Sequence, residues 1–203
     1  MILVTGATGL VGGSVLQRLL EARHDVRAAV RSVLQAEHAL RKTMAGNTAL
    51  RKGKIQLVEL DFLEFSEDAA RKLCEGCSSV VHCAGLVHQP NASSDLYKVL
   101  NEDATAHLAR AASMEQVQQF VFLSSSSVYG NRETNRVSEE EPCIADTSYA
   151  SSKIASENLL MASPPSSSTV ILRPSMVFGP GDRGNMLPLI KQVLSGKYFV
   201  VGA

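Results

Sequence analysis

The sequence has no tryptophan, only four cysteines and no excess of charge of either sign. Its 20 Lys and Arg residues balance 20 Asp and Glu residues, so the chain has no net field with which to hold nucleic acid or an anionic membrane. Four cysteines are too few for a disulfide scaffold, and Cys74 and Cys77 lack the further ligands of a zinc site. We therefore expect buried or loop thiols, no metal site and no nucleic-acid partner.

Long apolar runs are also missing. The longest, such as Phe120–Leu123 and Tyr198–Val201, fall far short of the ~20 residues that span a bilayer. The N-terminal segment Met1–Thr5 has neither a basic region nor an apolar stretch that ends at a cleavage site, as a secretory signal would. These absences predict a cytoplasmic protein that does not bind membranes.

Short β-branched runs alternate with helical periodicity along the 203 residues, a pattern typical of repeated βαβ units in one domain. We predict an α/β fold with a doubly wound parallel sheet, the Rossmann fold, whose strands are nearly continuously apolar because both faces are covered. Helices are expected at Leu10–Leu20 and Leu96–Ala112, and in residues 32–54 before a polar loop around Gly46 and Asn47. The expected strands are Ile2–Thr5, Val26–Val30, Ile55–Glu59, Ser79–His82, Phe120–Ser124 and Thr169–Leu172.

The sequence stops at Gly202 and Ala203, directly after a further candidate strand at Tyr198–Val201. No capping helix or polar tail follows that strand. We therefore expect the chain to be a fragment of a longer protein.

A glycine-rich turn follows the first expected strand and opens the first helix. Its glycines have the spacing G-x-x-G-x-x-G rather than G-x-G-x-x-G, and a turn of this kind lets the backbone approach a pyrophosphate at a helix N-terminus. A purely structural turn is the alternative, which the position at the first strand–helix junction disfavours. The candidate cofactor-binding residues here are Gly6, Thr8, Gly9, Leu10, Val11 and Gly12.

The end of the second expected strand indicates which dinucleotide is preferred. An acidic residue there binds the ribose hydroxyls of NAD, whereas an arginine accommodates the 2′-phosphate of NADP. The sequence has no acid at this place but has Arg31, with Ser32 or Arg27 as helpers, so NADP is favoured over NAD; a solvated arginine is the alternative. Asp61, followed by Phe62, comes after the third strand and is expected beside the adenine.

Tyr149 and Lys153 are four residues apart, hence on one face of a helix with Cβ atoms about 5–6 Å apart. A free tyrosine has a pKa of about 10, too high for a base at neutral pH. A neighbouring ammonium and an oxidised nicotinamide would lower that pKa and make the phenolate usable for acid–base chemistry. Hydroxyls at Ser124–Ser127, where a buried strand ends, could bind a substrate oxygen; turns that satisfy their own backbone are the alternative.

The chain resembles the extended short-chain dehydrogenase/reductases, specifically the NAD(P)-dependent epimerase/dehydratase group that acts on nucleotide sugars. The resemblance runs from Ile2 to about Gly202. The motifs that carry it are, in order, Thr5–Gly12, Asp61, Val81–Gly85, Asn101, Ser124–Gly130, Tyr149–Lys153, Leu172–Pro174 and Val177–Asp182.

This resemblance implies a role for each matching residue. Tyr149 becomes the catalytic acid/base, Lys153 its pKa partner and ribose anchor, and Ser125 the hydroxyl that orients the substrate. The other implied positions are Ala84, Gly85, Asn101 and the backbone near Pro174 at the cofactor, and Ser126 and Asn185 at the substrate, with Asn185 meeting nucleotide phosphates.

Two departures from the family pattern matter. The sugar 4,6-dehydratases have an Asp-Glu pair after the catalytic hydroxyl, where this chain has Ser126 and Ser127, so dehydration is not expected. Ordinary members exceed 300 residues, and their C-terminal part supplies much of the sugar pocket. We therefore expect residues 1–203 to form an NAD(P)-binding domain, of which about 174–203 begin a truncated substrate-binding part.

The leading hypothesis is an NAD(P)-dependent epimerase or reductase of a nucleotide sugar. The alternatives are a reductase or dehydrogenase of a non-sugar ketone or alcohol, such as a steroid or flavonoid, and a non-catalytic dinucleotide-binding protein. Homodimers that pair through two helices are common in the family, and the candidates here are Leu96–Ala112 and Tyr149–Met161. His82 is expected to be a packed residue near the cofactor rather than a catalyst.

Overall fold

The computed structural model describes residues 1–44, 53–87, 89, 91–131, 137–166, 168–179 and 186–196. The described residues form a six-stranded sheet in the order β3-β2-β1-β4-β5-β6, and every pairing is parallel. The chain winds outward in one direction from β1 to β3 and in the other from β4 to β6, which is the order of the Rossmann fold. The predicted fold class is confirmed.

The strands lie where the sequence placed them, with small shifts at one side of the sheet. The first four begin and end at the predicted residues, whereas β5 is displaced by one residue and β6 begins one residue earlier than predicted. The strands are β1 (Ile2–Thr5), β2 (Val26–Val30), β3 (Ile55–Glu59), β4 (Ser79–His82), β5 (Gln119–Leu123) and β6 (Ser168–Leu172).

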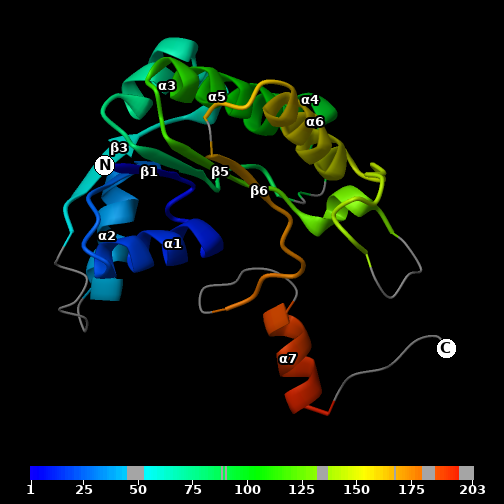
Figure 1. Ribbon diagram of the computed structural model, residues 1–203. Coiled ribbons are helices and arrows are strands. Elements are labelled where there is room, and N and C mark those ends of the chain that lie inside the picture. Colours follow the sequence, from blue (N-terminus) through cyan, green and yellow to red (C-terminus); the bar gives the residue numbers. More distant parts are fainter. Residues whose placement is uncertain are drawn as a thin grey trace.

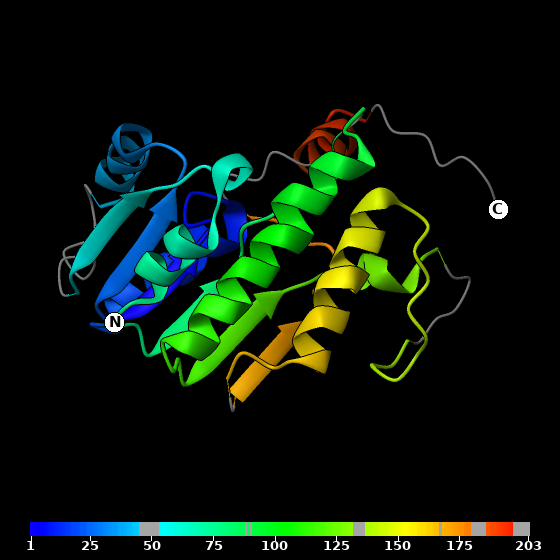
Figure 2. The ribbon, with the colours of Figure 1, turned by 90° about the horizontal axis from the view of Figure 1, so that it is seen from above.

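Helices cover both faces of the sheet (Figures 1 and 2). On one face lie α1 (Leu10–Glu21) and α2 (Val33–Met44). The other face carries α3 (Glu67–Cys74), α4 (Ser94–Tyr97), α5 (Ala104–Met114) and α6 (Ser148–Ala162). A further helix, α7 (Met186–Leu194), lies away from the sheet on the α1 side (Figure 1). The expected loop around Gly46 and the candidate strand at Tyr198–Val201 fall outside the described residues.

The predicted helix at Leu96–Ala112 is wrong in one respect, because it is not one regular α-helix. A π-helical segment, η3 (Lys98–Asp103), joins α4 to α5. Asn101 lies in this segment with 1% of its surface exposed and bonds with its side chain to Leu86 and Ser152. The spacing of apolar residues does not distinguish a π-helical turn from an α-helical one. Such π-helical turns are frequent at functional sites.

Alternation along the strands divides the interior into two cores. Leu3 belongs to the core under α3, α5 and α6, whereas its neighbour Val4 belongs to the core over α1 and α2. The expectation that every strand is covered on both faces is wrong for β6. Its residues Val170 and Leu172 are 39% and 46% exposed, since β6 is the edge strand and the described residues supply no layer over that side.

No helix in the described ranges combines the length and the apolar character needed to cross a membrane.

His82, the last residue of β4, is fully buried and ties three elements together. Its Nδ1 lies 2.7 Å from the Thr5 hydroxyl on β1, and its Nε2 lies 3.1 Å from the Thr105 hydroxyl on α5. Thr105 donates its own proton to the Asn101 carbonyl, so it accepts from His82 Nε2–H, and Nδ1 accepts from Thr5. Burial, followed by the nearby Lys153 charge, lowers the pKa of His82 to about 3.

Acidification is expected to remove stability through His82. Between its folded pKa of about 3 and its ordinary value of 6.5, only the unfolded chain binds the proton. The free energy of unfolding therefore falls as pH drops below about 6.5, by up to about 1.4 kcal/mol per pH unit from this group. Urea unfolding at pH 7, 6 and 5 measures the slope, which should be shallower in His82→Gln. An equal slope in the two proteins would contradict a neutral, buried His82.

Candidate active site

The glycine-rich turn between β1 and α1 is built on close backbone contacts. Gly6 has a φ of +66°, and a Cβ added there would lie 2.8 Å from Ala84 N. A Cβ on Gly12 would lie 2.2 Å from the Gly6 carbonyl oxygen, so side chains are excluded from the turn. Gly9 stands at the N-cap of α1 and provides no side-chain cap, while Thr8 and Gly9 are exposed. The turn therefore fits the pyrophosphate of a dinucleotide, which binds amide groups at a helix N-terminus.

Next to this turn, the end of β2 presents Arg31 to solvent. Ser32 directly precedes α2, and its carbonyl accepts from Ala36 N at 3.0 Å. Arg27 is not a helper of Arg31, contrary to the prediction. Its guanidinium donates to the carbonyls of Leu73 and Glu75 at 2.7 and 2.8 Å, and so caps the C-terminus of α3. Arg27 therefore lies at the start of β2, at the opposite end of the strand from Arg31.

The two residues expected near the adenine differ in their surroundings. Asp61 is exposed and caps the short helix η2 (Phe62–Glu64) by accepting from Leu63 N at 2.9 Å. The Phe62 ring packs instead against Phe65 and His82, with centroid distances of 5.1 and 6.3 Å. Asp61 thus remains accessible to a ligand, whereas the Phe62 side chain belongs to the core.

Beyond β4, the chain brings three of the predicted site residues together. A Cβ on the exposed Gly85 would lie 3.1 Å from Asn101 Oδ1 and 3.3 Å from Lys153 Nζ. Asn101 accepts from Leu86 N at 2.6 Å and donates to Ser152 Oγ at 2.9 Å. Asn101 therefore fixes the strand exit at Gly85 against α6, and both of its amide N–H groups are used in doing so.

Tyr149 and Lys153 lie on the buried face of α6, as their spacing predicted. Thr147 caps this helix by accepting from Ala150 N at 3.1 Å. Tyr149 is 8% exposed and Lys153 4% exposed, and Lys153 Nζ lies 6.0 Å from the centre of the Tyr149 ring.

The pKa of Tyr149 is raised above its ordinary value. Burial raises it, while a hydrogen bond with Ser125 acts in the opposite direction. The Lys153 ammonium is directed at the Leu123 carbonyl, 2.8 Å away. Burial also lowers the pKa of Lys153 to about 8. The site thus holds a buried phenol beside a buried lysine whose pKa is lowered towards neutrality.

Ser125 is held where β5 leaves the sheet. It caps the short helix η4 (Ser126–Tyr129), accepting from Ser127 N at 3.2 Å and from Ser127 Oγ at 2.9 Å. The neighbouring Ser126 N donates to the Pro174 carbonyl at 2.9 Å. Ser125 and Tyr149 are therefore brought together, whereas Asn185 lies outside the described residues.

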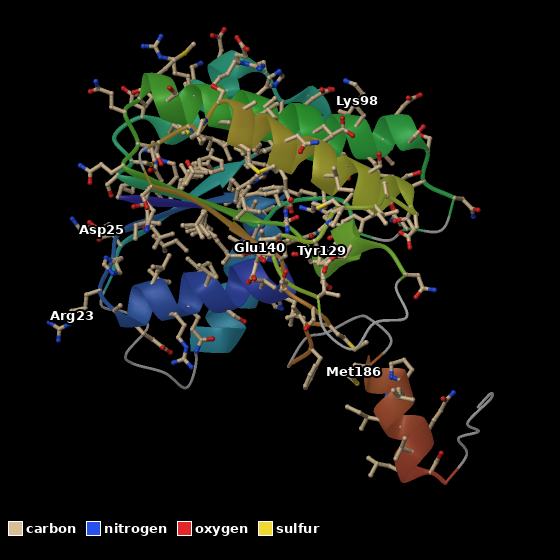
Figure 3. The ribbon with its side chains drawn as sticks, turned by 45° about the vertical axis from the view of Figure 1, so that its right-hand side comes forward. Arg23, Asp25, Lys98, Tyr129, Glu140 and Met186 are labelled. Carbon is tan, nitrogen blue, oxygen red and sulfur yellow. The ribbon has the colours of Figure 1, made fainter. Side chains whose placement is uncertain are left out.

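Sequence reasoning missed a buried ion pair behind these residues. Glu157 is 1% exposed and accepts from Arg173 Nη2 at 2.7 Å and from the Ser124 hydroxyl. Arg173 also donates to the hydroxyl of Tyr129 (Figure 3) at 2.7 Å. Glu157 follows Lys153 by one helical turn, and a charged residue on an otherwise buried helix face was the signal available in the sequence.

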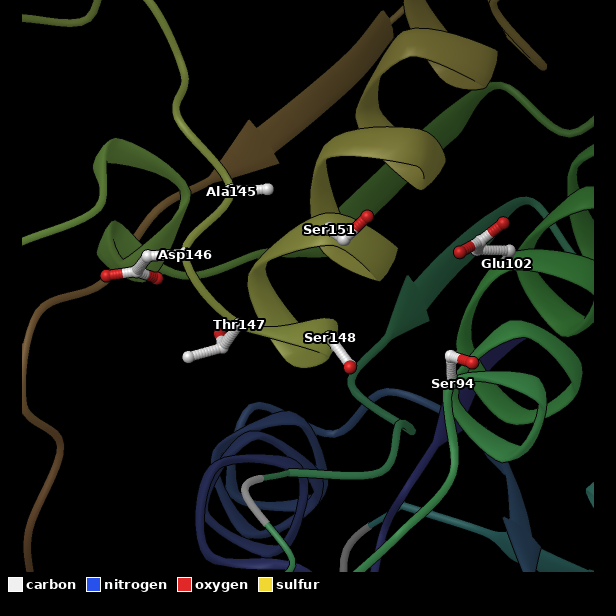
Figure 4. Close-up of a pocket in the computed structure, with 7 residues that line it drawn as sticks. All are labelled: Ser94, Glu102, Ala145, Asp146, Thr147, Ser148 and Ser151. Carbon is white, nitrogen blue, oxygen red and sulfur yellow. The ribbon is translucent and has the colours of Figure 1, made fainter.

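A surface pocket of about 340 Å³ lies between η3 and the start of α6 (Figure 4). None of Ser125, Tyr149 and Lys153 lines it, so it is separate from the candidate active site. Burial raises the pKa of Glu102 at its wall. Its lining residues are Ser94, Glu102, Ala145, Asp146, Thr147, Ser148 and Ser151.

Comparison with known proteins agrees with this geometry. The model of the NAD dependent epimerase/dehydratase family matches residues 2–202. UDP-glucose 4-epimerase of Vibrio cholerae is 30% identical over 211 residues, which cover 96% of this chain and 57% of that enzyme. A decarboxylating sterol-4-alpha-carboxylate 3-dehydrogenase of Schizosaccharomyces pombe is 31% identical over 202 residues, which cover 95% of this chain and 54% of that enzyme.

Solved structures are similar over nearly the whole chain. MoeE5, in complex with UDP-glucose and NAD, superposes with a TM-score of 0.77 at 27% identity, covering 97% of this chain and 62% of that one. UDP-glucuronic acid 4-epimerase from Bacillus cereus, in complex with NAD, gives the same TM-score and identity, covering 97% of this chain and 64% of that one. The chain thus spans between half and two thirds of the length of these relatives.

Removing the cation of the buried pair is expected to destabilise the fold strongly. Arg173→Met leaves Glu157 buried without its partner and should lower the free energy of unfolding by about 3–5 kcal/mol, measured by urea denaturation. The matched control is Arg18→Met, because the Arg18–Glu21 pair is on the surface and should contribute less than about 1 kcal/mol. Equal losses in the two variants would show that the Glu157–Arg173 pair has no special weight.

Proposed function

The chain belongs to the NAD dependent epimerase/dehydratase family, and from that premise we propose that it carries the catalytic residues of an NAD(P)-dependent epimerase or reductase of a nucleotide sugar. The observation that carries the proposal is the convergence of Ser125, Tyr149 and Lys153 beside Gly85. Residues 1–203 would be the NAD(P)-binding domain, with about 174–203 beginning the substrate-binding part. The chain covers 57% of the Vibrio cholerae enzyme, so a complete sugar pocket is not part of the proposal.

The proposed chemistry assigns one task to each side chain. When bound, the nicotinamide accepts a hydride from a sugar carbon and can return it. Tyr149 takes the proton of the sugar hydroxyl, and Ser125 orients the same oxygen through a hydrogen bond. Together with an oxidised nicotinamide, the Lys153 ammonium would favour the phenolate form of Tyr149, which burial by itself disfavours. Ser126 and Asn185 would bind the substrate. No dehydration step is proposed, because Ser126 and Ser127 stand where the dehydratases have an Asp-Glu pair.

For the cofactor, we propose that NADP is favoured over NAD. The support is Arg31, which is exposed at the end of β2 in a position where an acid would select NAD. The solved relatives named above hold NAD, so this preference would be a property of this chain.

The Arg31 hypothesis predicts a selective loss of affinity. Arg31→Ala should weaken NADP binding about tenfold and leave NAD binding within about twofold, since only NADP has a 2′-phosphate to lose a charged partner. Isothermal titration of the 203-residue chain with each dinucleotide measures both constants. Parallel losses for NADP and NAD would rule out a role in selectivity.

A non-sugar alcohol is the second candidate substrate. The favouring observation is the 31% identity to the Schizosaccharomyces pombe sterol-4-alpha-carboxylate 3-dehydrogenase. The same Tyr149 chemistry would then serve to oxidise a sterol hydroxyl. A non-catalytic dinucleotide-binding role is the third, and the presence of both Tyr149 and Lys153 disfavours it.

We also propose a cytoplasmic location and a homodimer. The four free cysteines support a reducing compartment. For the dimer, the candidate faces are those of α6 and of the segment from α4 to α5. Met114 and Met161, 64% and 56% exposed, lie at the ends of these helices.

Tyr149→Phe separates an enzyme from a binding protein. It should bind NADP and NAD as the unaltered chain does, because only a hydroxyl is removed, while the rate of epimer or carbonyl formation falls at least about 100-fold. UDP-glucose and a 4-carboxysterol are the two substrates to assay. Tyr97→Phe is the control for loss of a phenol, since Tyr97 bonds to the Val87 and Gln89 backbone. Undiminished turnover by Tyr149→Phe would overturn the assignment.

A further inference from the structure

Glu59, the last residue of β3, extends its carboxylate to the start of α2. Its Oε2 accepts from the backbone N–H of Val33, the first residue of α2, at 2.9 Å. In the sheet Glu59 pairs with Val30, the last residue of β2, and Leu60 N donates to the Val30 carbonyl at 2.8 Å. The carboxylate is therefore fixed next to the end of β2, although it comes from a different strand.

This carboxylate lies next to the end of β2, where Rossmann folds carry the residue that distinguishes NAD from NADP. Arg31 follows Val30 directly and is exposed, as is Glu59. Within the described part of the chain no carboxylate forms a salt bridge with the Arg31 guanidinium. A cation and an anion thus stand at the ends of the paired strands β2 and β3 with no salt bridge between them.

We propose that Glu59 is a specificity-determining residue that limits the use of NADP. Its negative charge opposes the 2′-phosphate, and its bond to Val33 occupies an amide that a phosphate would otherwise accept from. The same carboxylate is an acceptor for the ribose 2′-hydroxyl of NAD, the task of the acid that β2 itself lacks. Arg31 favours NADP and Glu59 opposes it, so selectivity is the balance of the two. This inference rests on the proposed function, because it needs a bound dinucleotide.

Glu59→Gln is the test, with NADP and NAD titrated calorimetrically into the 203-residue chain. Glutamine removes the charge but keeps an oxygen that accepts from Val33 and from a ribose hydroxyl. NADP should bind at least about fivefold more tightly than to the unaltered chain, and NAD should stay within about twofold. Because the cause is electrostatic, the gain should shrink when salt rises from about 0.05 to 0.5 M.

Two further variants separate charge from helix capping. Glu59→Asp keeps the charge on a shorter side chain, so its selectivity should remain near that of the unaltered chain; a gain for NADP equal to that of Glu59→Gln would overturn the electrostatic role. Glu75→Gln makes the same change of net charge at a distant place. Glu75 lies between α3 and the start of β4, at the end of the sheet where the strands begin. This variant should leave the ratio of the two constants unchanged, and a shift equal to that of Glu59→Gln would reduce the effect to net charge.

The outcomes distinguish the inference from the function on which it rests. If the unaltered chain binds neither dinucleotide, the proposed function fails and the inference fails with it. If both bind and Glu59→Gln leaves their ratio unchanged, the role of Glu59 alone is overturned. Thermal unfolding of each variant shows whether α2 is intact, and an unfolded Glu59→Gln protein would assign the residue to stability instead.

Discussion

The candidate active site depends on the interactions of the buried Glu157 carboxylate with Arg173 and Ser124. Ser125 sits at the end of β5, whereas Tyr149 and Lys153 sit on α6, and no covalent proximity holds these segments together. Glu157 lies on α6, one helical turn after Lys153. It accepts hydrogen bonds from Ser124, which follows β5, and from Arg173, which follows β6. A charge this deeply buried is costly unless all its partners are in place. That cost ties the hydroxyl and the phenol to one arrangement.

A second polar network joins the glycine-rich turn to the same helix. It runs from Ala84 N–H through Thr5, His82 and Thr105 to the Asn101 carbonyl, and from the Asn101 side chain to Ser152 on α6. Every member is buried or nearly so, and neutral His82 can serve both neighbours only in one tautomer. The π-helical segment places Asn101 where these bonds meet. The glycine-rich turn and α6 therefore share one rigid support.

Much of this arrangement could be predicted from the sequence, because its determinants are local. Continuous apolar runs fixed four strands to the residue, the glycine spacing located the turn, and the Tyr149–Lys153 spacing gave a shared helix face. Determinants that join distant segments could not be predicted. Arg27 caps α3, burial raises the pKa of Tyr149, and Glu59 reaches the end of β2 from another strand. Each of these depends on tertiary neighbours that sequence spacing does not reveal.

The sheet separates two cores, and this has a consequence for how the protein can vary. The core around Val4 and Leu16 supports the helices next to the glycine-rich turn, whereas the core around Leu3 and Phe120 supports α6. Substitutions in packed groups that share no contacts combine nearly additively. Repacking under α1 and α2 should therefore leave the α6 side largely undisturbed. The two faces can change separately in evolution, one around the glycine-rich turn and the other around α6.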